Sequence, residues 1–443
     1  MNVTAHSYQI GGKSSNQISA SIEEHIRSGR FAAGTVLPAI RALADRLEVS
    51  PTTVAAAYRS LRVRGLVRAG GRRGTIVNRR PPLATPSLPV APEGAINLAD
   101  GNPDPELLPA LAPILARIGG RHQLYGSETN SARLTELARR SFTRDRVPAN
   151  EIAVVSGAID GLERVLQAYL SPGDVVAVED PSYTGVLDLI AALGMIAEAV
   201  ALDEFGIRPN SLAAAIRADA KALILTPRAQ NPTGVALDKK RAAELRAILA
   251  QAPETLLIED DFGGPVSGAA AITVVDSRLP RWAVIRSVSK ALGPDLRLAV
   301  VAGDALTIAR VEGRQRLGPR WVSHILQDAV AAMWSDAKTM RQVQRAADTY
   351  TLRRHALIEE LAKVGIAAQG RSGLNVWIPV ADENAIIQSL LEAGWAVRPG
   401  AAYRVRSAPG IRVTISALKP ADARGFASDF ARALRPRAST NVA

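Results

Sequence analysis

The residues best suited to chemistry in this sequence surround Lys290. This lysine follows Ser287 and Ser289 at the end of the apolar run Trp282–Ile285, which predicts a short buried strand. Open α/β folds bind their ligands at the carboxyl ends of such strands. Arg297 comes shortly after, and hydroxyl groups with a guanidinium make a set suited to a phosphate. A lysine after a strand is also a common solvated surface group, so this cluster alone does not define a site.

Five other sets of polar residues follow predicted strands elsewhere in the chain. Ser156-Gly157-Ala158 comes after one strand and opens a helix, whose free N–H groups favour an anion. The others present an aromatic ring, an amide, an acid and a guanidinium, at Tyr183, Asn231, Asp260 and Arg412. Each set taken singly has an ordinary interpretation as a helix start, a turn or a surface cap. Their occurrence together, in this order, favours one shared ligand.

An alternation of strands and helices must position these groups. Apolar strand-like runs occur at Glu151–Val155, Val175–Glu179, Ala222–Leu225, Thr255–Ile258 and Trp282–Ile285. Helical patterns lie between them, for example at Gly161–Leu170, Gly185–Leu193 and Lys239–Leu249. This alternation predicts the α/β class, with a mostly parallel sheet and helices on both faces. The segment from about 350 to 437 has strands and helices of its own, and we expect a smaller α+β lobe there.

The first 80 residues differ from the rest of the chain in charge. They carry a net charge of +9, whereas the whole chain of 443 residues carries +12. Most of the basic excess therefore lies in the first fifth of the sequence, which indicates a polyanionic partner for that region. A solvated basic surface would give the same excess.

The same region predicts a helix-turn-helix followed by a hairpin. Residues 15–28 and Ile40–Leu47 each carry apolar side chains at helical spacing, and a third helix begins at Pro51 with Ser50 as its cap. Two short helices joined by a tight turn form a helix-turn-helix. Residues 65–77 then predict a small β-hairpin, or wing, whose tip is rich in glycine and arginine.

This pattern resembles the GntR family of winged helix-turn-helix repressors over residues 15–78. The matching phrases are Leu37–Ala44 and Val49–Val54, followed by Tyr58, Leu61 and the wing. The resemblance implies that the turn, the third helix and the wing contact operator DNA through Arg41, Ser50, Thr52, Thr53, Arg72 and Arg73. The first turn of a recognition helix reaches base edges, and a wing arginine can enter the minor groove. A helical hairpin that only packs against its neighbours is the structural alternative.

The domain boundaries and the general class of protein follow from composition. Residues 79–95 contain five prolines and predict an extended, semi-rigid linker between a winged helix at 10–78 and a larger domain at 96–437. The chain has no cysteine, which excludes disulfides and thiolate chemistry, and no residue cluster indicates a metal. Because it has neither a long apolar run nor a signal-peptide core, we expect a cytoplasmic protein with no membrane partner.

From about residue 96 to 435, the polar sets resemble fold-type-I pyridoxal 5′-phosphate (PLP) enzymes, the aspartate aminotransferase class. The resemblance implies that Lys290 binds this cofactor covalently, that Asp260 pairs with its ring nitrogen and that Asn231 bonds the ring 3′-oxygen. Tyr183 would stack on the ring, and Arg412 would bind a substrate carboxylate. The residues implied for the phosphate are Gly157, Ala158, Ser287, Ser289 and Arg297, with Tyr125 reaching the phosphate of a neighbouring subunit.

Two departures from that class affect the functional prediction. The class usually has a tyrosine shortly after the acid that pairs with the ring, but Phe262 stands here and has no hydroxyl. Its absence puts efficient transamination in doubt. The segment after Tyr125 also lacks the usual Asp-Pro-x-Gly continuation, which weakens the assignment of that residue.

A GntR-type winged helix joined by a linker to an aminotransferase-like domain is the architecture of MocR-type regulators. The sequence therefore predicts a PLP-dependent transcriptional regulator, in which the enzyme fold senses an amino acid or PLP-related effector and forms a homodimer on double-stranded operator DNA. One alternative is an active aminotransferase with an accessory DNA-binding domain. Another is a non-specific nucleic-acid binder with an inactive enzyme domain.

Overall fold

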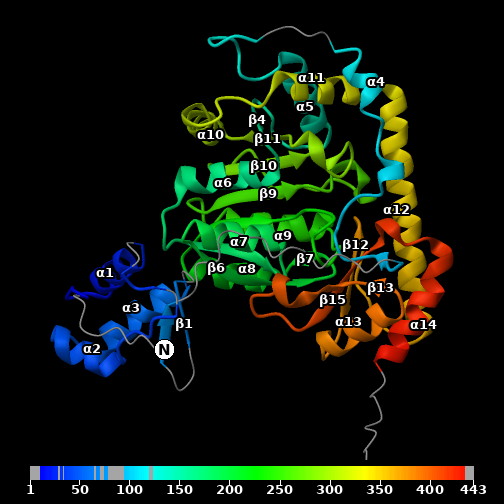
Figure 1. The fold of residues 1–443 in the computed structure, drawn as a ribbon. Helices are drawn as coiled ribbons and strands as arrows, with labels where there is room; N and C mark the ends of the chain where they lie inside the picture. Colours follow the sequence, from blue (N-terminus) through cyan, green and yellow to red (C-terminus); the bar gives the residue numbers. More distant parts are fainter. Residues whose placement is uncertain are drawn as a thin grey trace, which may run out of the picture. The chain divides into compact units, whose positions relative to one another are not determined.

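A computed structural model describes residues 10–27, 30–32, 34–63, 66–69, 74–77, 94–118 and 123–434 (Figure 1). The chain divides into two compact units. The first is Met1–Pro89 with Gly194–Ile196, and the second is Val90–Leu193 with Ala197–Ala443. Among the described residues, no helix is both long and apolar enough to cross a membrane.

The first unit contains three helices and a two-stranded hairpin. Its elements are α1 (Ser15–Arg27), α2 (Ile40–Leu47), α3 (Pro51–Val63), β1 (Val67–Ala69) and β2 (Thr75–Val77). The strands are antiparallel, with Val67 opposite Val77. The turn after α2 passes through the left-handed conformation at Glu48, where φ is 51°. Tyr58 ties α3 to the segment before α2, because its hydroxyl donates to the Pro38 carbonyl at 2.8 Å. This is the predicted helix-turn-helix with its hairpin.

The second unit is organised around an eight-stranded sheet with the order β4-β11-β10-β9-β8-β5-β6-β7. The strands are β4 (Glu151–Val155), β5 (Val175–Asp180), β6 (Ile196–Asp203), β7 (Gly206–Ile207), β8 (Ala220–Leu225), β9 (Leu256–Asp261), β10 (Trp282–Ser287) and β11 (Ala299–Gly303). β5, β8, β9 and β10 pair in parallel, whereas β11 is antiparallel to both β10 and β4. The predicted mostly parallel sheet is confirmed. β11, which lies between the edge strand β4 and β10, is an antiparallel strand that the pattern did not indicate.

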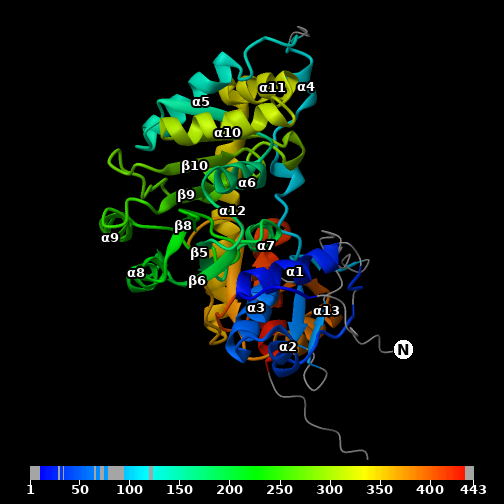
Figure 2. The ribbon, with the colours of Figure 1, turned by 90° about the vertical axis from the view of Figure 1, so that its left-hand side faces the viewer.

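Helices cover both faces of this sheet. The helices of the large part are α4 (Ala112–Leu115), α5 (Ala132–Arg144), α6 (Ala158–Tyr169), α7 (Thr184–Ala192), α8 (Pro209–Arg217), α9 (Lys239–Leu249), α10 (Ala305–Leu317), α11 (His324–Ser335) and α12 (Ala337–Lys363). In Figure 2, α5, α8 and α9 lie on one side of the sheet, and α6 and α7 lie on the other. Gly161 allows α6 to come close to the sheet, since a Cβ there would lie 3.3 Å from the Ile285 side chain.

The long helix α12 runs along the sheet toward a smaller α+β part (Figure 1). That part contains β12 (Asn375–Pro379), β14 (Arg398–Pro399) and β15 (Gly410–Thr414) in one sheet, with α13 (Glu383–Glu392) and α14 (Ala423–Ala433). A second small sheet pairs β13 (Trp395–Ala396) with β3 (Ile96–Asn97). The start of the unit therefore reaches the small part, which positions residues 99–101 beside β15.

Candidate cofactor and DNA-binding sites

Lys290 lies just beyond β10, and its side chain points to the segment that follows β3. Its Nζ donates to the Gly101 carbonyl at 2.9 Å. Burial, followed by the nearby charge of Arg412, lowers the pKa of Lys290 to about 8, although Asp100 opposes the shift. A lysine with this pKa has a larger neutral fraction near neutral pH than an ordinary lysine, and the neutral amine is the nucleophilic form.

Asp260 lies near the end of β9 and is 4% exposed. Burial raises the pKa of Asp260 to about 7, and the charges of Asp261 and Glu179 add to the shift. Its buried Oδ1 has no hydrogen-bond partner among the described residues. An unpaired buried acceptor costs free energy unless a ligand satisfies it. The N–H of a protonated pyridine ring is a partner that would do so, and this oxygen therefore fits PLP.

The Arg412 side chain projects from β15 toward Ala99 and Asn231. It donates to the Ala99 carbonyl and, at 3.3 Å, to Asn231 Oδ1, while its Nε has no partner among the described residues. Burial lowers the pKa of this guanidinium. Gly101 is required beside it, because a Cβ there would lie 3.3 Å from the guanidinium nitrogens and φ is +75°. The structure thus brings Arg412, Asn231 and the segment that accepts from Lys290 together in one place.

Four of the five predicted phosphate-binding residues form two neighbouring pairs, and Ala158 follows directly after one of them. Gly157 precedes α6 with φ of +100°, and a Cβ on it would lie 3.2 Å from the Arg297 guanidinium. Ser287 Oγ donates to Ser289 Oγ at 3.0 Å and accepts from the Ser289 N–H. Ala158 is the first residue of α6, so its N–H is among those without a helical partner. A glycine cradle, a helix N-terminus and a guanidinium fit a phosphate.

The two aromatic residues predicted for the cofactor lie in different surroundings. Tyr183 precedes α7 and is 39% exposed. Burial, together with the charges of Asp260 and Tyr403, raises the pKa of its hydroxyl. Tyr125 is 81% exposed and contacts the Trp321 ring, with centroids 5.6 Å apart. The structure therefore does not join Tyr125 to the cofactor residues of its own chain.

Sequence reasoning missed three residues of this site. The Tyr403 ring lies under the Arg412 guanidinium, 5.2 Å from centroid to carbon. Gly101 accepts from Lys290 and lies against Arg412, and the charge of Asp100 acts on the pKa of both side chains. Tyr403 had no local signal, whereas the Asp-Gly-Asn-Pro segment after β3 could have been recognised as a turn that brings its backbone close to a ligand.

Of the predicted DNA-contacting residues, Ser50, Thr52 and Thr53 lie at the start of α3, and Arg41 lies in the first turn of α2. Ser50 Oγ accepts from the Thr53 N–H at 3.1 Å, which caps the helix. Arg41 and Thr52 are exposed, and Arg59 is exposed on the same helical face as Thr52. Arg59 was not predicted from the pattern, although its spacing from Thr52 could have indicated it. Arg72 and Arg73 lie outside the described residues.

These two units define a protein that joins a DNA-binding domain to an aminotransferase-like domain. Residues 14–77 match the gntR family of bacterial regulatory proteins, and residues 93–430 match the class I and II aminotransferases. The chain therefore belongs to the GntR-family transcriptional regulators of the MocR type. It is 41% identical to the vitamin B6 salvage pathway transcriptional repressor PtsJ of Salmonella typhimurium, over 96% of this chain and 99% of that protein.

Two further similarities agree with this assignment. The transcriptional regulator TauR of Rhodobacter capsulatus is 27% identical, with 96% of this chain and 98% of TauR covered. The crystal structure of a kynurenine aminotransferase from Pyrococcus horikoshii superimposes with a TM-score of 0.70. That match has 22% identity and covers 77% of this chain and 91% of the other, so it supports the fold alone.

Proposed function

We propose that the aminotransferase-like unit of this regulator binds PLP at Lys290 and uses the loaded site to sense PLP itself or an amino acid. The observation that supports it most directly is the unpaired Oδ1 of Asp260, buried in the same site as a lysine of lowered pKa. A cationic ring would give the Asp260 oxygen a hydrogen-bond partner, and an electrophilic carbon would react with the neutral Lys290 amine. When bound, PLP supplies an aldehyde that takes up amines and a ring that withdraws electrons.

The protein groups have distinct roles in this proposal. Lys290 holds the cofactor through Nζ, which the Gly101 carbonyl orients. Asp260 holds a proton at the ring nitrogen, and its carboxylate becomes ionised opposite that charge. Asn231 is placed for the ring 3′-oxygen, Tyr183 for the ring face. Gly157, Ala158, Ser287, Ser289 and Arg297 bind the phosphate. Arg412 binds the carboxylate of an incoming amino acid, and its contacts to Ala99 and Asn231 keep it oriented.

Phe262 favours a regulatory role over catalytic turnover. It stands where the enzymes of this class usually have a tyrosine, and it has no hydroxyl group. The name of the Salmonella relative, a vitamin B6 salvage pathway repressor, favours PLP as the signal and repression as the output. We further propose that the protein acts as a homodimer on operator DNA in the cytoplasm, because two winged helices match two half-sites. In that dimer Tyr125 would reach the phosphate of the other subunit.

The test measures affinity for the DNA beside the protein's own gene in three states: without PLP, with PLP, and with PLP plus a panel of amino acids. A change of about 5–150-fold on adding PLP identifies PLP as the effector, and a change only with one amino acid identifies that amino acid. The same factor must appear in effector affinity measured with and without DNA. Equal affinity in all states would refute the proposal. Lys290→Ala is the matched control, since it should remove the response and leave basal DNA binding.

A second function, transamination, is supported by the otherwise complete set of Lys290, Asp260 and Arg412. Single-turnover spectra with amino donors, followed by steady-state assays with keto acids, separate the two. Sustained turnover at rates of about 1 s⁻¹ or more would make the protein an enzyme with an accessory DNA-binding unit. Binding without turnover would leave it a sensor.

A further inference from the structure

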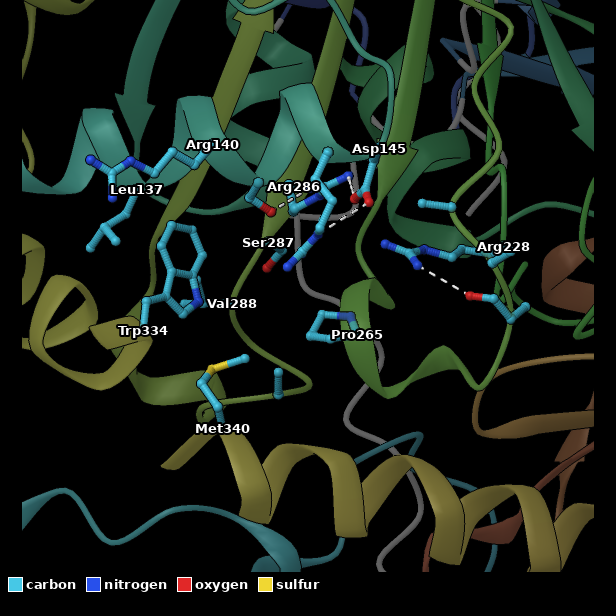
Figure 3. Close-up of a pocket in the computed structure, with 16 residues that line it drawn as sticks. Leu137, Arg140, Asp145, Arg228, Pro265, Arg286, Ser287, Val288, Trp334 and Met340 are labelled. Carbon is cyan, nitrogen blue, oxygen red and sulfur yellow. Dashed lines mark hydrogen bonds and ion pairs between the residues drawn. The ribbon is translucent and has the colours of Figure 1, made fainter. Parts of the chain in front are cut away.

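A cavity of about 440 Å³ lies beside the cofactor site but outside it (Figure 3). Its walls come from α5, the segment after β9, the end of β10 and the helices α11 and α12. Of the predicted cofactor residues, only Ser287 lines it. This volume falls in the range of about 300–1,000 Å³ that is common for small-molecule sites.

The cavity lies behind the strand that carries the cofactor's acid. Side chains alternate along a strand, so Asp260 and Asp261 project from opposite faces of β9. Asp261 pairs with Arg286 of the neighbouring strand. Arg286 in turn donates to Ser141 of α5 at 2.8 Å, and α5 lies on the sheet face opposite α6. The cavity therefore lies on the sheet face opposite the proposed PLP site, except at the end of β10, where Ser287 belongs to both.

The floor of the cavity is a buried network of ion pairs. Arg228 makes two bonds to Asp261, at 2.8 and 2.9 Å, and Arg286 pairs with Asp261 and Asp145 at 2.9 Å each. Burial alone would raise the pKa of Asp261, but Arg228 and Arg286 outweigh it and hold that pKa below its usual value. Figure 3 shows Arg286 between Asp145 and Ser287 at the centre of the site. The charged groups of the floor are thus paired with one another.

The rim adds positive charge that the floor does not neutralise. Arg140 and Arg144 stand on the same face of α5, four residues apart, and both side chains are exposed. Arg140 contacts Glu136 through Nε at 2.8 Å, and Arg144 approaches Asp145 through Nε at 3.6 Å. Their terminal amino groups remain for a ligand. The lining residues include four arginines and one aspartate, while Asp261 and Glu136, which pair with three of these arginines, lie outside the lining.

The remaining walls are apolar and include an indole ring. Leu137 of α5, Val288, Trp334 and Met340 face the cavity together with three consecutive alanines, Ala269–Ala271. An indole surface favours a flat ring through stacking, and neighbouring guanidinium groups favour an anion. A flat ring with one anionic group could stack on the indole and at the same time bind the guanidinium groups.

We propose that this cavity is a second ligand site, which binds a small flat molecule carrying one carboxylate or phosphate. The anionic group would contact Arg140 and Arg144, and the ring would lie against Trp334. The proposal does not depend on whether Lys290 binds PLP.

The experiment is isothermal titration calorimetry of the full-length protein with two anionic compounds and, for each, a related compound that lacks the anionic group. Nicotinate is compared with nicotinamide, and pyridoxine 5′-phosphate with pyridoxine, which distinguishes a carboxylate from a phosphate arm. We expect one anionic compound to bind at least about tenfold more tightly than its neutral counterpart, and its affinity to fall as the salt concentration rises. Equal binding of each anionic compound and its neutral counterpart, or no binding of either anionic compound, would overturn the proposal.

Variants locate the site. The pair Arg140→Ala and Arg144→Ala should weaken binding of the anion by about tenfold or more, and Ala270→Trp should abolish it by filling the cavity. Arg316→Ala is the matched control, because Arg316 is also an exposed arginine with a carboxylate at i−4, Glu312, on a helix away from the cavity. Arg412→Ala for the carboxylate probe and Arg297→Ala for the phosphate probe remove the side chains proposed to hold these groups in the cofactor site, and each must leave the affinity unchanged. Loss of binding in either variant, with unchanged binding in the rim variants, would assign the anion to the cofactor site and refute the second site.

Discussion

Two neighbouring aspartates on β9 should affect stability in opposite directions. Asp260→Asn should stabilise the cofactor-free protein at pH 8, whereas Asp261→Asn should destabilise it. Burial raises the pKa of Asp260 from 3.8 to about 7, while Arg228 and Arg286 hold the pKa of Asp261 down. The first carboxyl is therefore costly to ionise in the folded protein, and the second is stabilised as an anion.

The magnitude follows from proton linkage. In the unfolded chain Asp260 ionises near pH 4, but in the folded protein it keeps its proton until about pH 7. Its contribution to stability is present below pH 4, falls as the pH rises, and is lost above pH 7. Since each pKa unit corresponds to about 1.4 kcal/mol, the cost at pH 8 is up to about 4 kcal/mol, and an asparagine avoids it. Asp261→Asn leaves two buried guanidiniums poorly compensated, at a cost of about 3–5 kcal/mol.

Urea denaturation followed by tryptophan fluorescence measures both effects. All five tryptophans, Trp282, Trp321, Trp334, Trp377 and Trp395, lie in the second unit, so the signal reports that unit alone. The gain for Asp260→Asn should be larger at pH 8 than at pH 5, and the increase in stability on adding PLP should shrink. A loss of stability for Asp260→Asn at pH 8, or a gain independent of pH, would refute the reasoning.

Three other outcomes are expected. Lys290→Ala should prevent borohydride from fixing PLP to the chain, as seen by mass spectrometry of peptides, whereas the exposed Lys419→Ala should not. Arg412→Ala should weaken amino acid binding to the PLP-loaded protein by about tenfold or more in calorimetric titrations, with the absorbance of the bound cofactor retained. In DNA-binding assays over a range of salt, Arg59→Ala should weaken binding to all sequences and lower the salt slope by about one, whereas Thr52→Ala should mainly change the preference between sequences.

Local patterns in the sequence were sufficient for much of this architecture. The residues after a buried strand are close to it in the chain, so Lys290, Asp260 and the segment at Gly157 could be identified from adjacent apolar runs. The helix-turn-helix was predictable for the same reason, because Ser50 and Pro51 act on the helix that they begin. Such features need no knowledge of distant residues.

Contacts between distant parts of the chain were not predictable in this way. Arg286 contacts Ser141 and Asp145 because α5 packs on the sheet face toward which the Arg286 side chain of β10 projects. The position of Tyr403 under Arg412 depends on how the segment before β15 returns to the small sheet. The antiparallel course of β11 also depends on its partners, since a short apolar run does not specify the direction of its neighbours.

The charges of the site explain why loading it could act as a signal. Among the described residues, Asp260 has one oxygen without a hydrogen-bond partner and two other acids whose charges raise its pKa, while burial lowers the pKa of both Lys290 and Arg412. A ligand with a cationic ring and anionic arms offers each of these groups a partner at once. A ligand shifts a conformational equilibrium only by its difference in affinity between the states. Because Arg412 and Ala99 belong to the small α+β part and the segment that reaches it, whereas Asp260 belongs to the central sheet, one ligand that needs both would favour the arrangement in which they face each other.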